Sequence, residues 1–203
     1  MHLARQLGTG RSAVREAIRQ LVQEGLVDHE LHRGAVVRVV SLADYGDVYC
    51  AREVIESGAA RRLLEQEAEI DAAPLHDALE ALRAALADDG HLTDEAIAAD
   101  IRFHQELVRL CGSPRLTRAH DTLAAETRLL LRHHPLYPPT DYAGDHERLL
   151  DALERRDPRT PDLVAEHLRL SAQLIGNELA REASDGAKAG RNQTPTVEER
   201  PVA

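Results

Sequence analysis

The chain has 203 residues, 43% of them hydrophobic and 30% charged, which is enough for one or two domains with a buried core. It contains no run of roughly 18 uncharged apolar residues and lacks the basic-then-apolar layout of a signal peptide, so we expect a cytoplasmic protein with no membrane partner. Its two cysteines suit a reducing compartment and are too few for a cysteine-rich zinc site.

The net charge of −10 is unevenly distributed along the chain. Residues 1–40 carry six arginines and four acidic residues, a net charge of +2, whereas the other 163 residues carry 19 basic and 31 acidic residues, a net charge of −12. A basic segment joined to an acidic remainder is typical of a DNA-binding domain whose neighbouring domain does not bind DNA. With one phenylalanine and four tyrosines, the chain is poorly suited to stacking single-stranded bases.

The first part of the chain has the spacing of two short helices joined by a turn. Residues 3–7 present one apolar face, and Gly8 ends that helix. After a turn at Thr9-Gly10, apolar residues recur at helical spacing from position 14 to position 22, and Gly25 ends the second helix.

Two β-prone runs follow the second helix. They occupy residues 26–31 and 35–40, with His32-Arg33-Gly34 between them, and this pattern predicts a β-hairpin. Helix, turn, helix and hairpin together predict a winged helix-turn-helix domain over residues 1–40.

Three arginines of the second predicted helix favour DNA binding. Arg11, Arg15 and Arg19 are four residues apart, so they lie along one helix face. Arginines on a recognition helix reach base edges and phosphates in the major groove. The solvated face of an ordinary amphipathic helix would give the same positions, but the preceding turn and the following hairpin favour the DNA-binding interpretation.

Residues 41–183 are predicted to form an all-α domain. Ser41 is placed to cap its first helix, with Asp44 three residues later. Six helices are expected, at residues 41–67, 70–88, 93–111, 115–134, 140–156 and 160–182. The short connections between them predict an antiparallel bundle. Residues 184–203 have no apolar period and are predicted to form a disordered tail.

One predicted helix of this bundle carries a candidate metal-binding pair. Asp100 and His104 are four residues apart, so both side chains leave the same helix face. A carboxylate with an imidazole is a suitable start for a zinc, nickel or similar divalent-ion site. His146 and His167 lie inside later predicted helices and are candidates to complete it. The alternative is that these histidines are solvated or serve only the packing of the helices.

The N-terminal segment resembles the GntR family of bacterial transcription regulators. The matching residues are Leu3 to Gly8, Arg11 to Ile18, Leu21, Glu24 to Val27 and Arg33-Gly34. Gly10 and Ser12-Ala13 depart from the Ser and Thr-Pro that are usual in the family. The resemblance implies DNA contacts by the second helix and by the wing, at Arg11, Ser12, Arg15, Arg19, Arg33 and Gly34.

Winged domains of that family have another helix and part of a second before the point at which this chain begins. We therefore expect either that the functional start lies upstream or that the domain is incomplete. In both cases the chain as given is predicted to bind operator DNA weakly.

Residues 42–180 resemble the all-helical FCD effector domain of the FadR-type branch of the same family. The matching segments are Tyr49 to Glu56, Asp100 to His104, Gly112 to Pro114, Asp145 to Leu153 and Glu166 to Leu168. The resemblance implies a divalent metal, with zinc the first candidate and nickel, manganese and iron also open. The implied ligands are Asp100, His104, His146 and His167.

The same resemblance implies an effector and an assembly. The effector would be a small organic acid whose carboxylate faces Arg52, and the helical domain would form a homodimer. Spacing alone also allows Arg52 to pair with Glu56, one helical turn later. Ser113, the residue after Gly112, stands where relatives often have Asn, so the resemblance does not fix the contacts that this turn would make with the effector.

Two other functions stay open alongside that of a regulator. An all-α metal-dependent hydrolase would use the Asp and three His together with the pairs at residues 76–77 and 120–121, although neither pair has a partner at a suitable spacing. A ligand-binding module without a competent DNA-binding domain is the second alternative. The sequence therefore predicts a non-enzymatic, homodimeric transcription regulator that binds double-stranded operator DNA under the control of a small carboxylate at a metal site.

Overall fold

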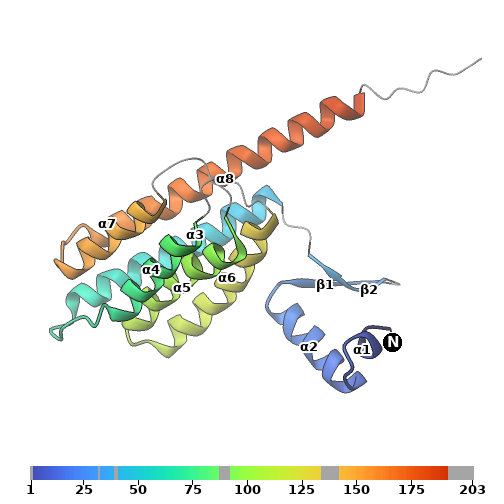
Figure 1. Ribbon diagram of the computed structural model, residues 1–203, viewed down its shortest axis with the longest axis horizontal. Helices are drawn as coiled ribbons and strands as arrows, with labels where there is room; N and C mark the ends of the chain where they lie inside the picture. The colour runs from blue at the N-terminus through green and yellow to red at the C-terminus, as the bar shows by residue number, and fades with distance from the viewer. Residues whose placement is uncertain (1, 32, 39–40, 87–91, 134–141, 192–203) are drawn as a thin grey trace, which may run out of the picture.

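The computed structural model describes residues 2–31, 33–38, 41–86, 92–133 and 142–191. These residues form two helices, a two-stranded hairpin and six further helices (Figure 1). The elements are α1 (His2–Gln6), α2 (Arg11–Gln23), β1 (Val27–Glu30), β2 (Gly34–Val37), α3 (Leu42–Glu65), α4 (Ala73–Ala85), α5 (Asp94–Leu110), α6 (Pro114–His133), α7 (Tyr142–Glu154) and α8 (Thr160–Arg191). The predicted fold class, mainly α with an N-terminal winged helix-turn-helix and a helical bundle, is confirmed.

Helices α1 and α2 and the β-hairpin form the N-terminal domain, here called the head (residues 2–38). Gly25, with a φ of 72°, turns the chain sharply from α2 toward β1, a backbone conformation that glycine adopts without steric cost. The two strands pair antiparallel, with Val27 opposite Val37 and Glu30 opposite Gly34. The hairpin is therefore shorter than the predicted runs, and residues 32 and 39–40 of those runs lie outside the described residues.

The head buries little apolar surface. Among its described residues the buried hydrophobic side chains are Ala4 and Val27, and every residue of α2 is at least partly exposed. Six large apolar side chains of the head are exposed to solvent: Leu3, Leu7, Leu21, Val22, Leu31 and Val37. Because burial of apolar surface is the main force that stabilises a fold, the head has a much weaker core than the rest of the chain.

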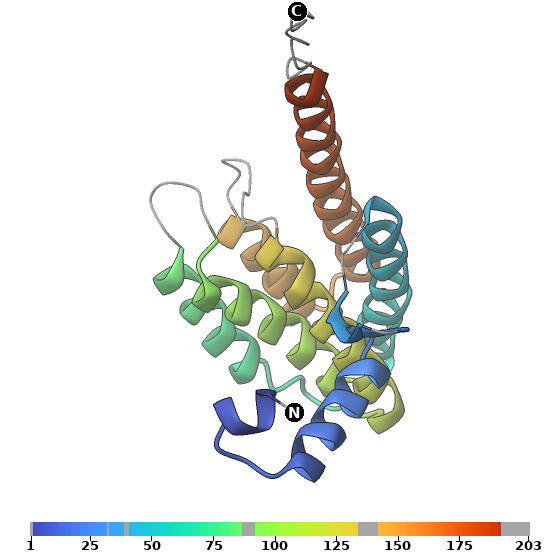
Figure 2. The same ribbon diagram turned by 90° about the vertical axis from the view of Figure 1, so that its right-hand side faces the viewer.

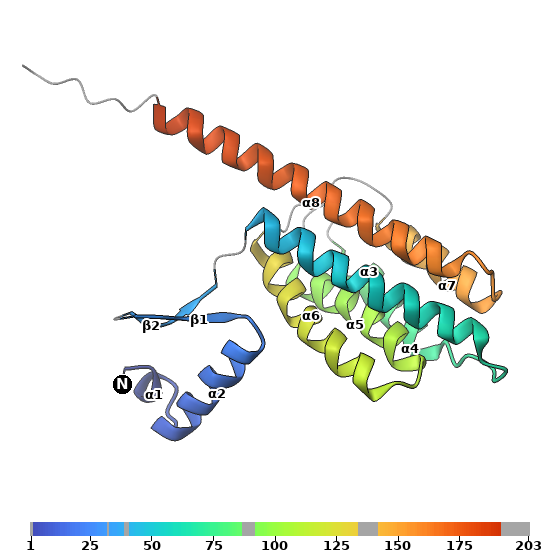
Figure 3. The same ribbon diagram turned by 180° about the vertical axis from the view of Figure 1, so that it is seen from behind.

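Helices α3 to α8 form the bundle, here called the body (residues 41–191). Helix α3 packs along α8, and α5 lies against α3, α4 and α6 at the centre (Figures 1 and 3). Nine of the 17 residues of α5 are buried, so polar side chains on its inner face lie in the core of the body. None of the described helices combines the length and the apolar character needed to span a membrane.

The start of α3 has the predicted cap. Ser41 Oγ accepts a 3.2 Å hydrogen bond from the backbone N–H of Asp44, and the Asp44 carboxylate accepts a 2.9 Å bond from the backbone N–H of Ser41. This reciprocal capping box satisfies donors that the first helical turn leaves unpaired. Helices α3 to α7 begin and end within three residues of their predicted bounds.

Helix α8 is longer than predicted and extends beyond the rest of the body (Figure 2). It continues to Arg191, so the prediction of disorder from residue 184 is corrected for residues 184–191, and residues 192–203 lie outside the described part of the chain. Those eight residues include two glycines, which are unfavourable inside a helix, so their helical state does not follow from local propensity or from an apolar period.

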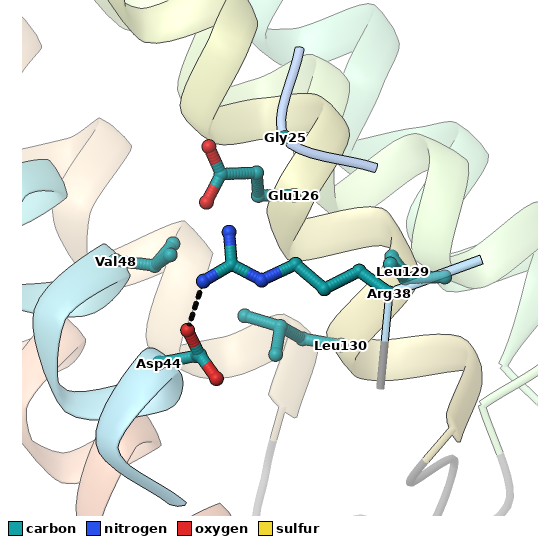
Figure 4. Close-up of a pocket in the computed structure, with 7 residues that line it drawn as sticks. All are labelled: Gly25, Arg38, Asp44, Val48, Glu126, Leu129 and Leu130. Atoms are coloured by element: carbon teal, nitrogen blue, oxygen red, sulfur yellow. Dashed lines mark hydrogen bonds and ion pairs between the residues drawn. The ribbon is translucent and has the colours of Figure 1, made fainter. Parts of the chain in front are cut away.

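The head meets the body at a small pocket formed by the turn between α2 and β1, the residue that follows β2, and helices α3 and α6 (Figure 4). Its lining consists of Gly25, Arg38, Asp44, Val48, Glu126, Leu129 and Leu130. Arg38 donates a 2.5 Å hydrogen bond to Asp44. A Cβ placed on Gly25 would lie 3.1 Å from Glu126 Oε1, so the backbone of the head approaches α6 closely at this point. Burial at this pocket raises the pKa of Glu126, which the charge of Arg38 opposes.

Candidate metal centre and DNA-binding surface

Four side chains from three helices meet in the core of the body. Helix α5 contributes Asp100 and His104, α7 contributes His146, and α8 contributes His167, and all four are buried. One ring nitrogen from each histidine lies within 4.8 Å of the other two. The structure thus brings together the four residues that the sequence analysis selected as candidate ligands.

The ring of His146 is oriented by the backbone of its own helix. Its Nδ1 lies 2.8 Å from the carbonyl oxygen of Tyr142, which can only accept a hydrogen bond, so Nδ1 carries the proton. The other nitrogen, Nε2, is buried, lies 3.0 Å from Asp100 Oδ1 and has no hydrogen-bond partner among the described residues. In the neutral ring a lone pair on Nε2 therefore faces a carboxylate oxygen, an arrangement that a cation between them would relieve.

The ring of His104 is oriented in the same sense by a side chain. Its Nδ1 lies 2.6 Å from the carboxylate oxygen Oε2 of Glu56 on α3, and its Nε2 lies 3.8 Å from Asp100 Oδ1. A proton on Nδ1 leaves the lone pair of Nε2 directed toward Asp100. Tyr142 also reaches this point, since its hydroxyl donates a 2.6 Å hydrogen bond to Asp100 Oδ1.

The surroundings favour the protonation states in which these groups bind a metal. Burial lowers the pKa of His104, and it lowers that of His167 well below the ordinary value, with a further contribution from the other two imidazoles. Burial opposes ionisation of Asp100, yet the neighbouring imidazoles and the Arg52 guanidinium lower its pKa. Metal binding requires deprotonated ligands, and the lowered pKa values of His104, His167 and Asp100 favour that state for these three groups.

This donor set fits a divalent transition metal. Three imidazoles and one carboxylate suit zinc, nickel, manganese or iron, and one nitrogen of each imidazole lies close enough to the other two to share an ion. The residues present are therefore compatible with the metal that the FCD resemblance implies.

Arg52 lies beside the same cluster on α3. Its Nε donates a 2.8 Å hydrogen bond to Glu56 Oε1, so the pairing that the four-residue spacing allows is present. Its guanidinium also lies 5.0 Å from the centre of the Tyr49 ring, a cation–π contact. Arg52, Asp100, His104 and His167 line one cavity of about 10 Å³, which has room for a single water molecule.

A wider groove also has His167 in its lining. It runs between α7 and α8, has a volume of about 660 Å³, and is lined by apolar side chains such as Leu149, Leu163 and Leu170 together with charged residues of both signs. The groove and the small cavity at the candidate metal centre therefore have one residue, His167, in common.

Both parts of the chain match known domains. Residues 1–37 match the bacterial regulatory proteins of the gntR family, and residues 47–170 match the FCD domain. The "Probable D-xylose utilization operon transcriptional repressor" of Paenarthrobacter nicotinovorans is 33% identical over 168 residues, which span 82% of this chain and 71% of that relative. The chain belongs to the GntR family of bacterial regulatory proteins.

Two further comparisons agree with this membership. The HTH-type transcriptional repressor RspR of Escherichia coli is 25% identical to this GntR-family chain over 184 residues, covering 89% of the chain and 79% of the repressor. A solved GntR transcriptional regulator from Rhodococcus sp. RHA1 has a TM-score of 0.75 at 26% identity, covering 86% of this chain and 84% of that one. The protein is therefore a transcription regulator of the GntR family with an FCD domain, as the sequence analysis predicted.

The head of this GntR-family regulator presents its candidate DNA-contacting residues to solvent. On α2 the side chains of Arg11, Ser12, Arg15 and Arg19 are all exposed. Arg19 forms a 2.7 Å ion pair with Glu16, whereas Arg11 and Arg15 have no ion-pair partner among the described residues. Two of the three arginines are thus available to phosphates without first breaking an ion pair to a described residue.

The wing carries the other two candidates. Gly34 begins β2 with a φ of 81°, and Arg33 precedes it at the exposed end of the hairpin. Arg33 forms a 2.7 Å ion pair with Glu30, both partners being largely exposed. Exposed pairs of this kind contribute little, so DNA phosphates can replace Glu30 at small cost.

Two histidine-aspartate pairs considered for a hydrolase do not meet in this GntR-family regulator. His76 on α4 lies at the surface, 2.8 Å from Glu154, while His120 on α6 is buried and 2.8 Å from Glu56. The side chain of Asp121 accepts a 2.7 Å hydrogen bond from Gln105. The two pairs therefore lie in different places, and neither pair as a unit joins Asp100 in one site.

The sequence analysis did not predict a role at the metal site for three residues that the structure places near it: Glu56, His120 and Tyr142. Glu56 entered only as a partner for Arg52, and His120 only as half of a dipeptide. No spacing rule connects positions 48 or 64 residues apart in the chain, so the contacts of Glu56 with His104 and His120 become visible only in the folded body.

Proposed function

We propose that this GntR-family regulator holds a divalent metal through Asp100, His104, His146 and His167, and that a small carboxylate bound at that metal controls its affinity for operator DNA. The observation that carries the proposal is the meeting of three buried imidazoles, with one nitrogen of each within 4.8 Å of the other two, beside Asp100, whose Oδ1 lies 3.0 Å from His146 Nε2. Zinc is the first candidate because imidazole and carboxylate ligands both suit it, and nickel, manganese and iron accept the same donors.

The effector proposal rests on the surroundings of the four ligands. A bound metal would supply a Lewis-acidic anchor for a carboxylate oxygen, and Arg52 provides a permanent positive charge on the same cavity. That cavity has room for about one water molecule. The part of an effector beyond its carboxylate group could therefore enter only if side chains moved aside. His167 lines both the cavity and the groove between α7 and α8, which supports entry from that side.

The DNA-binding proposal assigns roles to the head. The exposed face of α2 would lie in the major groove, with Arg11, Ser12, Arg15 and Arg19 directed to bases and phosphates, and the wing at Arg33 and Gly34 would reach the minor groove. We propose a homodimer of the FadR-type branch, since helix-turn-helix proteins commonly bind paired half-sites with two-fold symmetry. A lone protomer in light scattering at micromolar concentration would contradict the dimer.

Control of DNA binding requires that the effector bind two arrangements of the protein unequally. Helix α3 is the element suited to connect them, because its first turn contacts the head through Asp44 and its middle carries Arg52 beside the candidate metal centre. We expect the effector to change how α3 packs and thereby how the head is held.

The test combines metal analysis with DNA binding by the full chain. Mass spectrometry of the native protein is expected to find one divalent ion per protomer, which a chelator removes. Fluorescence anisotropy with a duplex from the protein's own upstream region, against a scrambled duplex at two salt concentrations, is expected to show specific binding. Binding of small carboxylates that does not depend on metal would remove the effector mechanism while leaving the DNA-binding role intact.

A further inference from the structure

Glu56 is a fully buried carboxylate that lies behind the candidate metal centre on α3. It accepts three hydrogen bonds, each from a different side chain. Oε1 accepts from Arg52 Nε and from His120 Nε2, both at 2.8 Å, and Oε2 accepts from His104 Nδ1 at 2.6 Å. Three donors on two oxygens leave this carboxylate in one orientation.

Its contact with His104 has a direct chemical consequence. A neutral imidazole carries one proton, and a carboxylate at 2.6 Å from Nδ1 requires that proton to be on Nδ1. The lone pair then resides on Nε2, which faces Asp100 and the cavity. The choice between the two tautomers of His104 is thus made by a residue 48 positions earlier in the chain.

We propose that Glu56 is a positioning residue of the metal centre: it holds His104 in the tautomer and ring orientation that present Nε2 to the ion. This inference rests on the proposed metal site. Metal-ligating histidines depend on such partners for orientation and basicity, and removing the partner costs on the order of 10–100-fold in metal affinity.

His120 supports Glu56 from the far side. It lies on α6, is 1% exposed, and its Nδ1 has no hydrogen-bond partner among the described residues. The bond from Nε2 to Glu56 is therefore the polar contact that anchors this ring. Arg52 and His120 hold the Glu56 carboxylate in place, and that carboxylate in turn orients the His104 ring. Helices α3, α5 and α6 therefore all contribute to the orientation of His104.

The substitution Glu56→Gln tests this role. It keeps the size of the side chain but replaces one acceptor oxygen by an NH₂ donor, so at least one of the three donors loses its partner. We expect zinc affinity, measured by competition with a chromophoric chelator, to fall about 10–100-fold. We also expect the visible spectrum of the cobalt-substituted protein to change, because the ligand field depends on the orientation of His104.

Glu53→Gln is the matched control. Glu53 lies on the same helix, is only partly exposed, and its nearest recorded charge partner is Arg169 at 3.6 Å rather than any candidate ligand. It makes the same chemical change without touching the centre, so zinc affinity and the cobalt spectrum are expected to match those of the wild type.

The outcomes separate this inference from the function on which it rests. If the wild-type chain takes up no zinc and no cobalt, both the metal site and the role of Glu56 are overturned. If the wild type binds zinc and Glu56→Gln binds it equally well with an unchanged cobalt spectrum, the role of Glu56 alone is overturned.

A second measurement does not depend on the variant's folding. Nitrogen-15 spectra of the histidine rings in the wild-type, zinc-loaded chain report which nitrogen of each ring carries a proton and which binds metal. We expect His104 to be protonated at Nδ1 and bound through Nε2. Binding of zinc through Nδ1 of His104 would overturn the proposal, because that nitrogen cannot then donate to Glu56.

Discussion

Arg38, the last described residue of the head, donates a 2.5 Å hydrogen bond to Asp44 in the first turn of α3 (Figure 4). The same carboxylate accepts the backbone N–H of Ser41 and so caps α3. One acidic side chain therefore both begins the body's first helix and holds the end of the wing. Under the proposed mechanism, this direct contact would transmit a change in α3 to the head.

The Arg38–Asp44 pair is expected to contribute a modest but measurable coupling between head and body. The two side chains are 37% and 25% exposed, and partly exposed pairs contribute about 0.2–1 kcal/mol. A double-mutant cycle with Arg38→Ala and Asp44→Asn, read as the free energy of unfolding, is expected to give a coupling energy in that range. Strictly additive effects of the two substitutions would show that the pair does not hold the junction.

The capping box at α3 is expected to weaken in acid. The hydrogen bonds from Ser41, with the charge of Arg38, lower the pKa of Asp44 below its ordinary value of 3.8, although burial opposes them. A folded-state pKa below the unfolded value means that the stabilisation is complete above pH 3.8 and is lost as the pH falls through the folded-state pKa. Carboxyl NMR of Asp44 measures that pKa, and a value at or above 3.8 would contradict the capping contacts.

Removal of the metal is expected to destabilise the body. Ligand at 100 times its dissociation constant stabilises the state that binds it by about 2.7 kcal/mol, so zinc should raise the melting temperature and a chelator should lower it. His146→Gln is expected to abolish this response. His76→Gln is the control, because His76 is a surface histidine paired with Glu154 and should leave the response intact. Equal zinc responses of the two variants would exclude His146 from the site.

Loss of one α2 arginine is expected to weaken binding to all DNA sequences and to reduce its salt dependence. Each phosphate contact contributes about 0.9 to the slope of log affinity against log salt, so Arg15→Ala should lower that slope by roughly this amount. Arg148→Ala is the control, since Arg148 is an exposed arginine on α7, at the end of the body away from the head (Figure 3). A slope that Arg15→Ala leaves unchanged would argue against a phosphate contact by this residue.

The head is expected to unfold before the body. It has few buried apolar side chains, whereas the body has a continuous core around α5. Hydrogen exchange followed by mass spectrometry should show fast exchange in α1, α2 and the hairpin under conditions in which α5 remains protected. Equal protection of the head and of α5 would contradict this expectation. Specific DNA should slow exchange in the head, because a ligand that binds only the folded state stabilises it.

Local patterns in the sequence determined most of the secondary structure. The capping pair Ser41 and Asp44, the turn at Gly25 and the helical spacing of apolar residues predicted the elements of head and body to within a few residues, because each depends on neighbours one helical turn apart. The same reasoning put Asp100 and His104 on one face of a helix. It did not predict the helix at residues 184–191, which lack both an apolar period and consistently high helix propensity.

The tertiary structure decided what these groups face. The packing of separate helices brings His146 and His167 to Asp100 and places Glu56 against His104. The contact between head and body brings Arg38 to the cap of α3. Which nitrogen of an imidazole carries the proton depends on the acceptor that packing brings to it, and that acceptor for His104 lies 48 residues away. Spacing along one helix determines the face on which a side chain lies, whereas the packing of separate helices determines its partner and hence its chemistry.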